Sequence, residues 1–209
     1  MNMRSVLCVL VLVVMGALQV MAMTDEEIRG AYATSYGYEK IQDYDNAIKV
    51  LADVLYTDSR GYFVNLRLGW LNYMKGQYAD ARVHYQLAIK ASSGSIEARL
   101  GLMLPLLAQT RYADVEVKAR EIIAVDPGNY YANLRLAYVL RLQAKPTQAL
   151  AVLSPMVGRY PSDTSLLLET GLNRVALKQT ESARKIFNAV LLHEPENVTA
   201  KTQLYYLPR

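Results

Sequence analysis

Small and hydrophobic residues recur along this chain every 34 residues, between Ile28 and Asn197. A first series consists of Ala47, Ala81, Val115, Ala149 and Ala183. Twelve residues before each member lies a mostly small residue, namely Ser35, Gly69, Met103, Ala137 and Gly171. Thirteen residues after each member lies a position typical of turns, occupied by Ser59, Ser93, Pro127, Pro161 and Pro195. The chain therefore contains five units in one register, with no insertion or deletion.

Each unit contains two stretches of about 13 residues with helical apolar periodicity, joined by a short turn, which predicts a helical hairpin. The small residue on the first helix and the alanine on the second allow the two backbones to approach closely. Proline between units disfavours helix and separates successive hairpins. One hairpin cannot bury its apolar face alone, so the hairpins are expected to stack around a continuous core. The predicted fold is all-α.

The second unit, Tyr62 to Ser95, most clearly resembles a tetratricopeptide repeat. The matching residues are Leu68, Gly69, Gly76, Tyr78, Ala81, Tyr85 and Ala88. The resemblance implies a right-handed α-solenoid with a concave groove over residues 24–197. Its units are 28–61, 62–95, 96–129, 130–163 and 164–197, followed by a short partial helix in 198–209. That last segment either packs on the fifth hairpin or leaves Tyr205 and Tyr206 as an exposed apolar patch.

Two local features qualify this regular picture. Thr24 to Glu27 has the pattern of a capping box at the start of the first helix. In the third unit Met103 replaces a small residue and Pro105 falls inside the predicted first helix. We expect proline there to kink the helix or remove a hydrogen bond, which would bend the solenoid. Pro146 lies at a turn and is expected to be harmless.

Residues 1–22 have the pattern of a secretory signal peptide. Arg4 precedes an uncharged stretch from Ser5 to Thr24, and Val20-Met21-Ala22 suits a cleavage site. The segment predicts export, with a periplasmic location favoured because Cys8 is the only cysteine and would be removed. The alternative is an uncleaved anchor through residues 5–23 that associates with a membrane and faces the periplasm or the exterior.

Composition narrows the classes of function. The chain is 52% hydrophobic and 20% charged, as globular proteins are, and its net charge is only +4. No dense run of lysine or arginine indicates nucleic-acid binding. The histidines, His84 and His193, have no neighbouring residues at metal-ligand spacing. Because motifs for nucleophiles or phosphate loops are also missing, the sequence predicts neither an enzyme nor a cofactor.

In proteins of the tetratricopeptide repeat family the first helices of each hairpin line the groove. The register then gives these candidate partner-binding residues: Tyr32, Tyr36, Phe63, Arg67, Trp70, Tyr73, Tyr131, Arg135, Tyr138 and Arg141. Tyrosine, tryptophan and arginine carry much of the binding energy at protein interfaces. Some family members hold a C-terminal carboxylate with lysine and asparagine, but the corresponding residues here do not match. They are Tyr32, Tyr36, Arg67, Glu97 and Gly101.

The resulting hypothesis is an exported protein–protein interaction scaffold that binds a peptide or protein segment in its groove. Two alternatives remain open at this point. One is a module of an envelope assembly that synthesises or secretes polysaccharide, in which tyrosine and tryptophan stack on a glycan. The other is a structural repeat protein that self-associates through Tyr205-Tyr206-Leu207.

Overall fold

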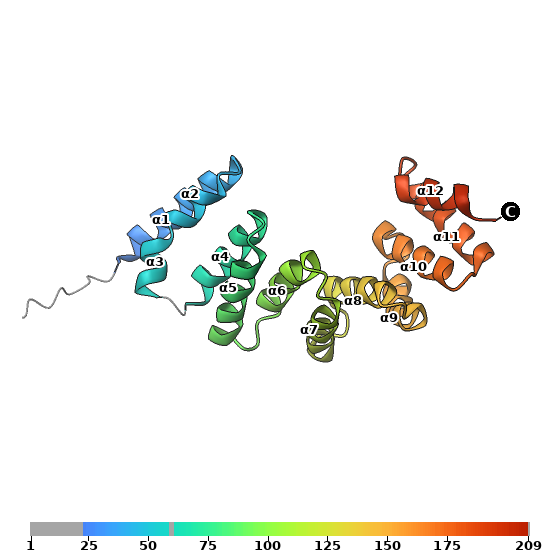
Figure 1. Cartoon of the computed structure of the whole chain (residues 1–209), viewed down its shortest axis with the longest axis horizontal. Coiled ribbons are helices and arrows are strands. Elements are labelled where there is room, and N and C mark those ends of the chain that lie inside the picture. Colours follow the sequence, from blue (N-terminus) through green and yellow to red (C-terminus); the bar gives the residue numbers. More distant parts are fainter. Residues whose placement is uncertain (1–22, 59–60, 209) are drawn as a thin grey trace, which may run out of the picture.

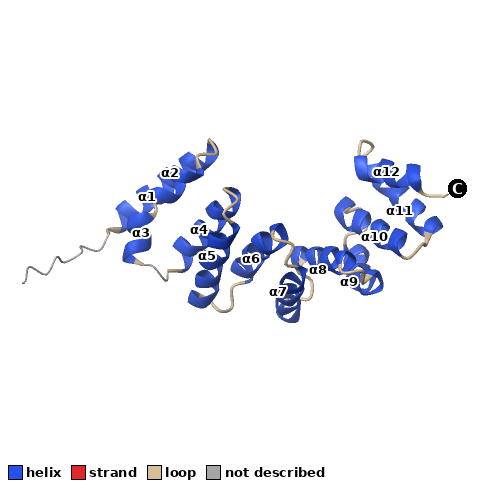
Figure 2. Ribbon diagram, viewed as in Figure 1, coloured by secondary structure: helices blue, strands red, loops and turns tan. Residues whose placement is uncertain are grey.

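The computed structural model describes residues 23–58 and 61–208. The predicted signal segment 1–22, with Cys8, and the turn residue Ser59 lie outside this range. The described residues form twelve helices and no strand, stacked as successive antiparallel pairs in an elongated, curved array (Figures 1 and 2). The all-α solenoid predicted from the repeat is therefore confirmed.

The helix bounds are α1 Asp25–Lys40, α2 Tyr44–Lys49, α3 Ala52–Thr57, α4 Tyr62–Met74, α5 Tyr78–Ala91, α6 Ile96–Ala108, α7 Tyr112–Val125, α8 Tyr130–Leu142, α9 Pro146–Arg159, α10 Thr164–Ala176, α11 Thr180–His193 and α12 Val198–Tyr206. The first helices α4, α6, α8, α10 and α12 thus start 34 residues apart.

Side-chain caps begin four of these five helices, all except α4. Ser95, Asn129, Asp163 and Asn197 each accept a hydrogen bond from the backbone N–H three residues later, at 2.9–3.0 Å. Such a bond satisfies one of the amides that a helix N-terminus leaves unpaired. At the first helix, Thr24 and Glu27 form the predicted capping box, with the Thr24 amide 2.7 Å from Glu27 Oε2.

Within each hairpin the core depends on complementary side-chain sizes at two positions. The ring of Tyr85 packs over Gly69, and the ring of Phe187 packs over Gly171, so closely that an added Cβ would lie within 3 Å of either ring. In the third repeat the sizes are exchanged, because Met103 on α6 and Ala119 on α7 occupy the same two positions and are fully buried. Conserving the total volume in this way keeps a core well packed.

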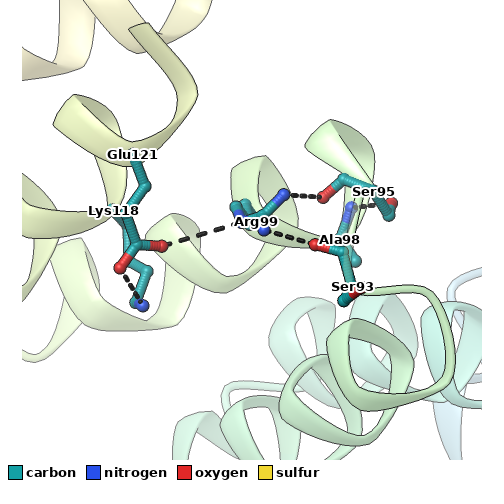
Figure 3. A network of polar contacts seen from close by, with 6 residues as sticks. All are labelled: Ser93, Ser95, Ala98, Arg99, Lys118 and Glu121. Carbon is teal, nitrogen blue, oxygen red and sulfur yellow. Dashed lines mark hydrogen bonds and ion pairs between the residues drawn. The ribbon is translucent and has the colours of Figure 1, made fainter. Parts of the chain in front are cut away.

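The turn between α5 and α6 is held by Arg99 (Figure 3). Its guanidinium donates to the carbonyl oxygens of Ser93 and Ser95, the latter at 3.2 Å. The same side chain lies 3.6 Å from a carboxylate oxygen of Glu121 on α7. Later turns carry proline where this one carries Ser93. The hydrogen bonds of the Arg99 side chain therefore restrain this turn, as proline restrains the later turns.

The first repeat departs from the expected pair of long helices. Its second helix is divided into α2 and α3 at Val50 and Leu51. Leu51 N–H bonds to the Ile48 carbonyl three residues back, as in a tight 3₁₀ turn. Leu51 is completely buried in a cluster with Val64 and Leu68 of the next repeat. Its equivalents Leu153 and Phe187 are equally buried in unbroken helices, so burial alone does not account for the break.

Pro105 and Pro146 both lie within helices. Pro105 lies inside α6, which continues unbroken to Ala108. Proline lacks the amide that would otherwise bond to the Gly101 carbonyl, so the expected loss of one helical hydrogen bond is present. Pro146 occupies the first turn of α9, where a missing amide costs nothing.

The C-terminal helix α12 divides its side chains between core and solvent. Ala200 is fully buried, and Leu204 and Leu207 pack against the cluster that contains Phe187. Tyr205 and Tyr206 remain 81% and 76% exposed. The C-terminal segment thus packs on the fifth hairpin and also leaves Tyr205 and Tyr206 exposed, so the two alternatives expected from the sequence are both present. In the part of the chain that the structure describes, none of the helices has the length and hydropathy required to span a bilayer.

Candidate partner-binding groove

The first helices of four successive repeats enclose a cavity of about 620 Å³, which we call the groove. Its lining residues are Tyr32, Tyr36, Glu39, Phe63, Leu66, Arg67, Trp70, Tyr85, Glu97, Leu100, Gly101, Leu104, Tyr131 and Arg135. All of them except Tyr85 lie on α1, α4, α6 or α8. The volume is within the range of cavities that hold ligands.

Three aromatic side chains of the groove are largely open to solvent. Phe63 is 74% exposed, Tyr131 is 56% exposed and Tyr36 is 52% exposed. Phe63 stands edge-on to Tyr62, and Tyr131 stands edge-on to Tyr130, each pair with ring centroids 5.2 Å apart. The neighbouring ring restricts each exposed aromatic, so less rotamer entropy is lost if it becomes buried at an interface.

Two predicted binding residues, Arg67 and Trp70, are already held by Glu39. Arg67 forms an ion pair with Glu39 Oε2, and Trp70 Nε1 donates to Glu39 Oε1 at 2.5 Å. Arg67 also donates to Ser35 Oγ at 3.2 Å and stacks on Tyr36 at 3.8 Å from the ring centroid. This buried network joins the first repeat to the second, and only the remaining faces of these side chains line the groove.

Three other predicted residues do not line this cavity. Arg141 binds Glu169 with two hydrogen bonds of 2.5 and 3.2 Å and lies over the Tyr138 ring at 5.4 Å. Tyr138 is 39% exposed. Tyr73 packs between Trp70 and Tyr78, with ring centroids 5.9 and 6.0 Å away. The structure therefore brings together Tyr32, Tyr36, Phe63, Arg67, Trp70, Tyr131 and Arg135, but separates Tyr73, Tyr138 and Arg141 from them.

Arg135 is the groove cation with the fewest partners. Its Nη1 donates to the Leu100 carbonyl at 2.7 Å, and its guanidinium lies 5.6 Å from the centroid of the Tyr131 ring. Burial lowers the pKa of the Arg135 guanidinium, and the nearby tyrosines oppose this effect. Among the described residues, no carboxylate forms an ion pair with it.

A second cavity of about 400 Å³ adjoins the groove between the first and second repeats. The two cavities share Tyr32, Tyr36 and Phe63. Burial raises the pKa of the Tyr32 phenol to about 12, so this hydroxyl stays protonated near neutral pH. The groove thus continues past Phe63 toward the start of α1.

A protein-family model described as tetratricopeptide repeat (TPR) matches residues 32–96. This segment holds all but the first four residues of the first repeat, all of the second and the first residue of the third. Residues 32–96 therefore carry TPR repeats, and the described chain has the all-α solenoid fold of TPR proteins. Comparison with curated protein sequences gives no match.

Solved structures of other TPR proteins share this fold. MamA 41-end from Desulfovibrio magneticus RS-1 has a TM-score of 0.75 at 15% identity, covering 85% of this chain and 99% of that one. YrrB, a TPR protein with an unusual peptide-binding site, has a TM-score of 0.70 at 13% identity, covering 85% and 92%. TTC0263, a thermophilic TPR protein in Thermus thermophilus, has a TM-score of 0.63 at 11% identity, covering 85% and 96%. At these identities the likeness shows the fold alone.

The core of the TPR hairpin explains one residue that departs from the carboxylate-binding pattern. An added Cβ at Gly101 would lie 2.2 Å from Tyr85 Cε1, so no side chain fits there while Tyr85 keeps its place. Tyr85 is 3% exposed but contributes to the floor of the groove, and burial raises the pKa of its phenol. The repeat pattern identifies Tyr85 only as a residue that matches the family, not as part of the groove. The small residue at Gly101 was the signal that the ring extends beneath the next repeat.

The two histidines of the chain lie apart on α5 and α11. His84 Nδ1 is 3.0 Å from Asn65 Oδ1, and burial lowers its pKa. In the part of the chain that the structure describes, no three metal-ligating side chains cluster. His84 therefore serves the interface between α4 and α5.

Proposed function

We propose that this TPR protein is an interaction scaffold whose groove receives an extended or helical segment of a partner protein. TPR repeats are scaffolds for protein–protein interaction. The observation that carries the finer proposal is the exposure of Phe63, Tyr131 and Tyr36 around one 620 Å³ cavity. Large aromatics of a soluble domain gathered around a cavity favour a binding site, because water is a poor solvent for them.

The interior of the groove suits such a segment. Leu66, Leu100 and Leu104 line it with apolar surface, whereas Arg67 and Glu39 neutralise one another. An apolar centre with few charged groups is typical of the buried core of an interface. Phe63 and Tyr131 come from different repeats, so a bound segment would cross at least the second to fourth repeats.

The test is affinity capture from native cells with the tagged full chain. We expect Phe63→Ala with Tyr131→Ala to lose partners that the parent chain captures, because truncating two interface anchors typically costs at least tenfold in affinity. Both side chains are exposed, so the fold should tolerate the change. Tyr56→Ala is the matched control, since Tyr56 is 71% exposed and lines neither cavity. Equal capture by all three proteins would place the binding surface outside the groove.

We also propose that the chain is exported through its first 22 residues, on the basis of their sequence pattern. Cell fractionation followed by N-terminal sequencing tests this. A periplasmic product beginning at Met23 is expected. A product that retains residues 5–23 in the membrane fraction would support the anchor instead, and an intact product in the cytoplasm would contradict export.

A further inference from the structure

The charged residues of the groove differ in how well they are compensated. Glu39 and Arg67 form an ion pair. Glu97 accepts a hydrogen bond from the Tyr62 hydroxyl at 3.0 Å and is exposed to water. Arg135 is half-buried and donates to one backbone carbonyl, that of Leu100. A guanidinium has five N–H donors, so most of the hydrogen-bonding capacity of Arg135 is directed to solvent in the groove.

The groups around Arg135 do not supply a counter-charge. The titratable neighbours that act on it are Tyr73 from α4, Tyr131 from α8 and Tyr85 from α5. Phenols are neutral at physiological pH, but their hydroxyls can donate hydrogen bonds. A cation that has lost part of its hydration and lacks a carboxylate is costly, and burial accordingly lowers the pKa of this group. Arg135 and its tyrosines thus form an electropositive floor beside the apolar side chains of Leu66, Leu100 and Leu104.

Because Arg135 is a partly buried cation without a carboxylate partner, a negatively charged group on the ligand would complement it. We propose that Arg135 binds the side-chain carboxylate of an aspartate or glutamate in the partner segment. The proposal deepens the proposed function and rests on it. Guanidinium and carboxylate fit each other with two parallel hydrogen bonds, and such charged pairs are stronger than neutral ones. Leu66, Leu100 and Leu104 line the same cavity, so the residues flanking the acid are apolar or aromatic.

The pair would also be protected from solvent. A ligand that fills the groove excludes water from Arg135, which strengthens the attraction between the two charges. The other buried arginine of the groove, Arg67, cannot serve in this way because Glu39 already holds it. Selectivity for an acidic residue is therefore assigned to a single side chain.

The experiment is a selection of random peptides with amidated C-termini on the full chain, followed by titration of the enriched peptides by fluorescence anisotropy. Each acidic peptide is compared with its Gln or Asn counterpart. We expect the acidic form to bind about tenfold more tightly or better, as a charge-assisted hydrogen bond implies. Arg135→Gln should abolish this difference. Arg120→Gln removes the same charge from an exposed site on α7 and should preserve it. Circular dichroism establishes that both variants are folded.

The outcomes distinguish a failure of the proposed role of Arg135 from a failure of the proposed function. Groove-dependent peptides without any preference for an acid, or with a preference that survives Arg135→Gln, would overturn the role of Arg135 and leave the proposed function standing. The selection is repeated with free C-termini and with phosphorylated peptides, and binders found only in those repeats would also overturn the role of Arg135. If no peptide binds the parent chain, or binding is unaffected by Phe63→Ala with Tyr131→Ala, both proposals fail.

Discussion

Arg141 on α8 and Glu169 on α10 are joined by two hydrogen bonds across adjacent repeats and are 28 residues apart. Glu39 on α1 and Arg67 on α4 are also 28 residues apart and form an ion pair across the first and second repeats. The acid and the base have exchanged places between the two pairs. One pair of positions in the repeat thus holds an ion pair at two junctions, with opposite polarity.

This relationship predicts the effect of breaking the first pair. Glu39→Ala leaves the guanidinium of Arg67 buried, at 5% side-chain exposure, without its carboxylate. Removing one partner of a buried pair costs about 3 kcal/mol of folding free energy. We expect a loss of that order in urea unfolding, concentrated in the first two repeats because repeats are stabilised mainly by their neighbours.

Exchanging the two residues is the control. Because the Arg141–Glu169 pair shows that the opposite polarity fits this geometry, Glu39→Arg with Arg67→Glu should be more stable than the sum of the single changes predicts. A double variant no more stable than that sum would mean that Ser35 and Tyr36, and not the charge pair, secure Arg67.

The period of the repeat was sufficient to predict the fold, because each repeat depends on local spacing. Even the exchange of sizes between Met103 and Ala119 is visible in the register once the two positions are compared. The division of α2 from α3 was not predictable in this way. Leu153 and Phe187, the equivalents of Leu51, are equally buried in unbroken helices, so neither the register nor burial distinguishes the repeat that breaks.

The candidate site was predictable as a face but not as a set of contacts. The register places Trp70 and Arg67 on the concave face, but it does not reveal that Glu39 binds both. The same register does not distinguish Arg135 from the other candidate arginines, Arg67 and Arg141. Its distinction is that no carboxylate among the described residues forms an ion pair with it, and the sequence alone does not show which side chains pair between repeats.

A second prediction concerns the turn inside each hairpin. Gly76 and its equivalents Gln42, Thr110, Ala144 and Lys178 all have positive φ, between 55° and 83°. Only glycine adopts this conformation without steric cost, and β-branched residues tolerate it least. Thr110→Gly should therefore raise the free energy of unfolding by about 0.5 kcal/mol, after the added chain entropy of glycine is subtracted.

The reverse change completes that test. Gly76→Ala should lower the free energy of unfolding by about 1 kcal/mol, since nothing lies within 4 Å of the new Cβ and only the backbone conformation opposes it. Thermal and urea unfolding of both variants measure the two effects. If Thr110→Gly lowered the free energy of unfolding and Gly76→Ala raised it, a side chain at this position would stabilise the turn by more than the backbone strain destabilises it.

A third prediction concerns the turn that Arg99 holds. Ser92 and Asp126 have nearly the same backbone angles, with φ of −136° and −135° and ψ of 88° and 83°, and Asp126 precedes a proline. Ser93→Pro should therefore fit, and should stabilise the protein by about 0.5 kcal/mol through the unfolded state. It should also reduce the destabilisation caused by Arg99→Ala. An additive double variant in urea unfolding would mean that Arg99 and the turn backbone act independently.

The last prediction is a dependence of stability on pH at His84. Asn65 Nδ2 donates to the Gly61 carbonyl at 2.9 Å, so its Oδ1 faces His84 and accepts from Nδ1. Burial lowers the pKa of His84 below its usual value near 6.5, and the attraction of Asp80 opposes this only in part. Below about pH 6.5 the unfolded chain binds a proton that the folded protein resists, so stability is full above that pH and falls as the pH drops toward the folded pKa.

Urea unfolding at about pH 7.5 and about pH 5.5 measures this contribution. His84→Gln keeps a side-chain N–H donor for Asn65 but does not titrate over this range. The variant should therefore lose less stability than the parent when the pH is lowered. Aspartates and glutamates change little over the interval, because their usual pKa values lie below it. An equal loss in both proteins would show that His84 takes up its proton as readily folded as unfolded, which its burial beneath α4 argues against.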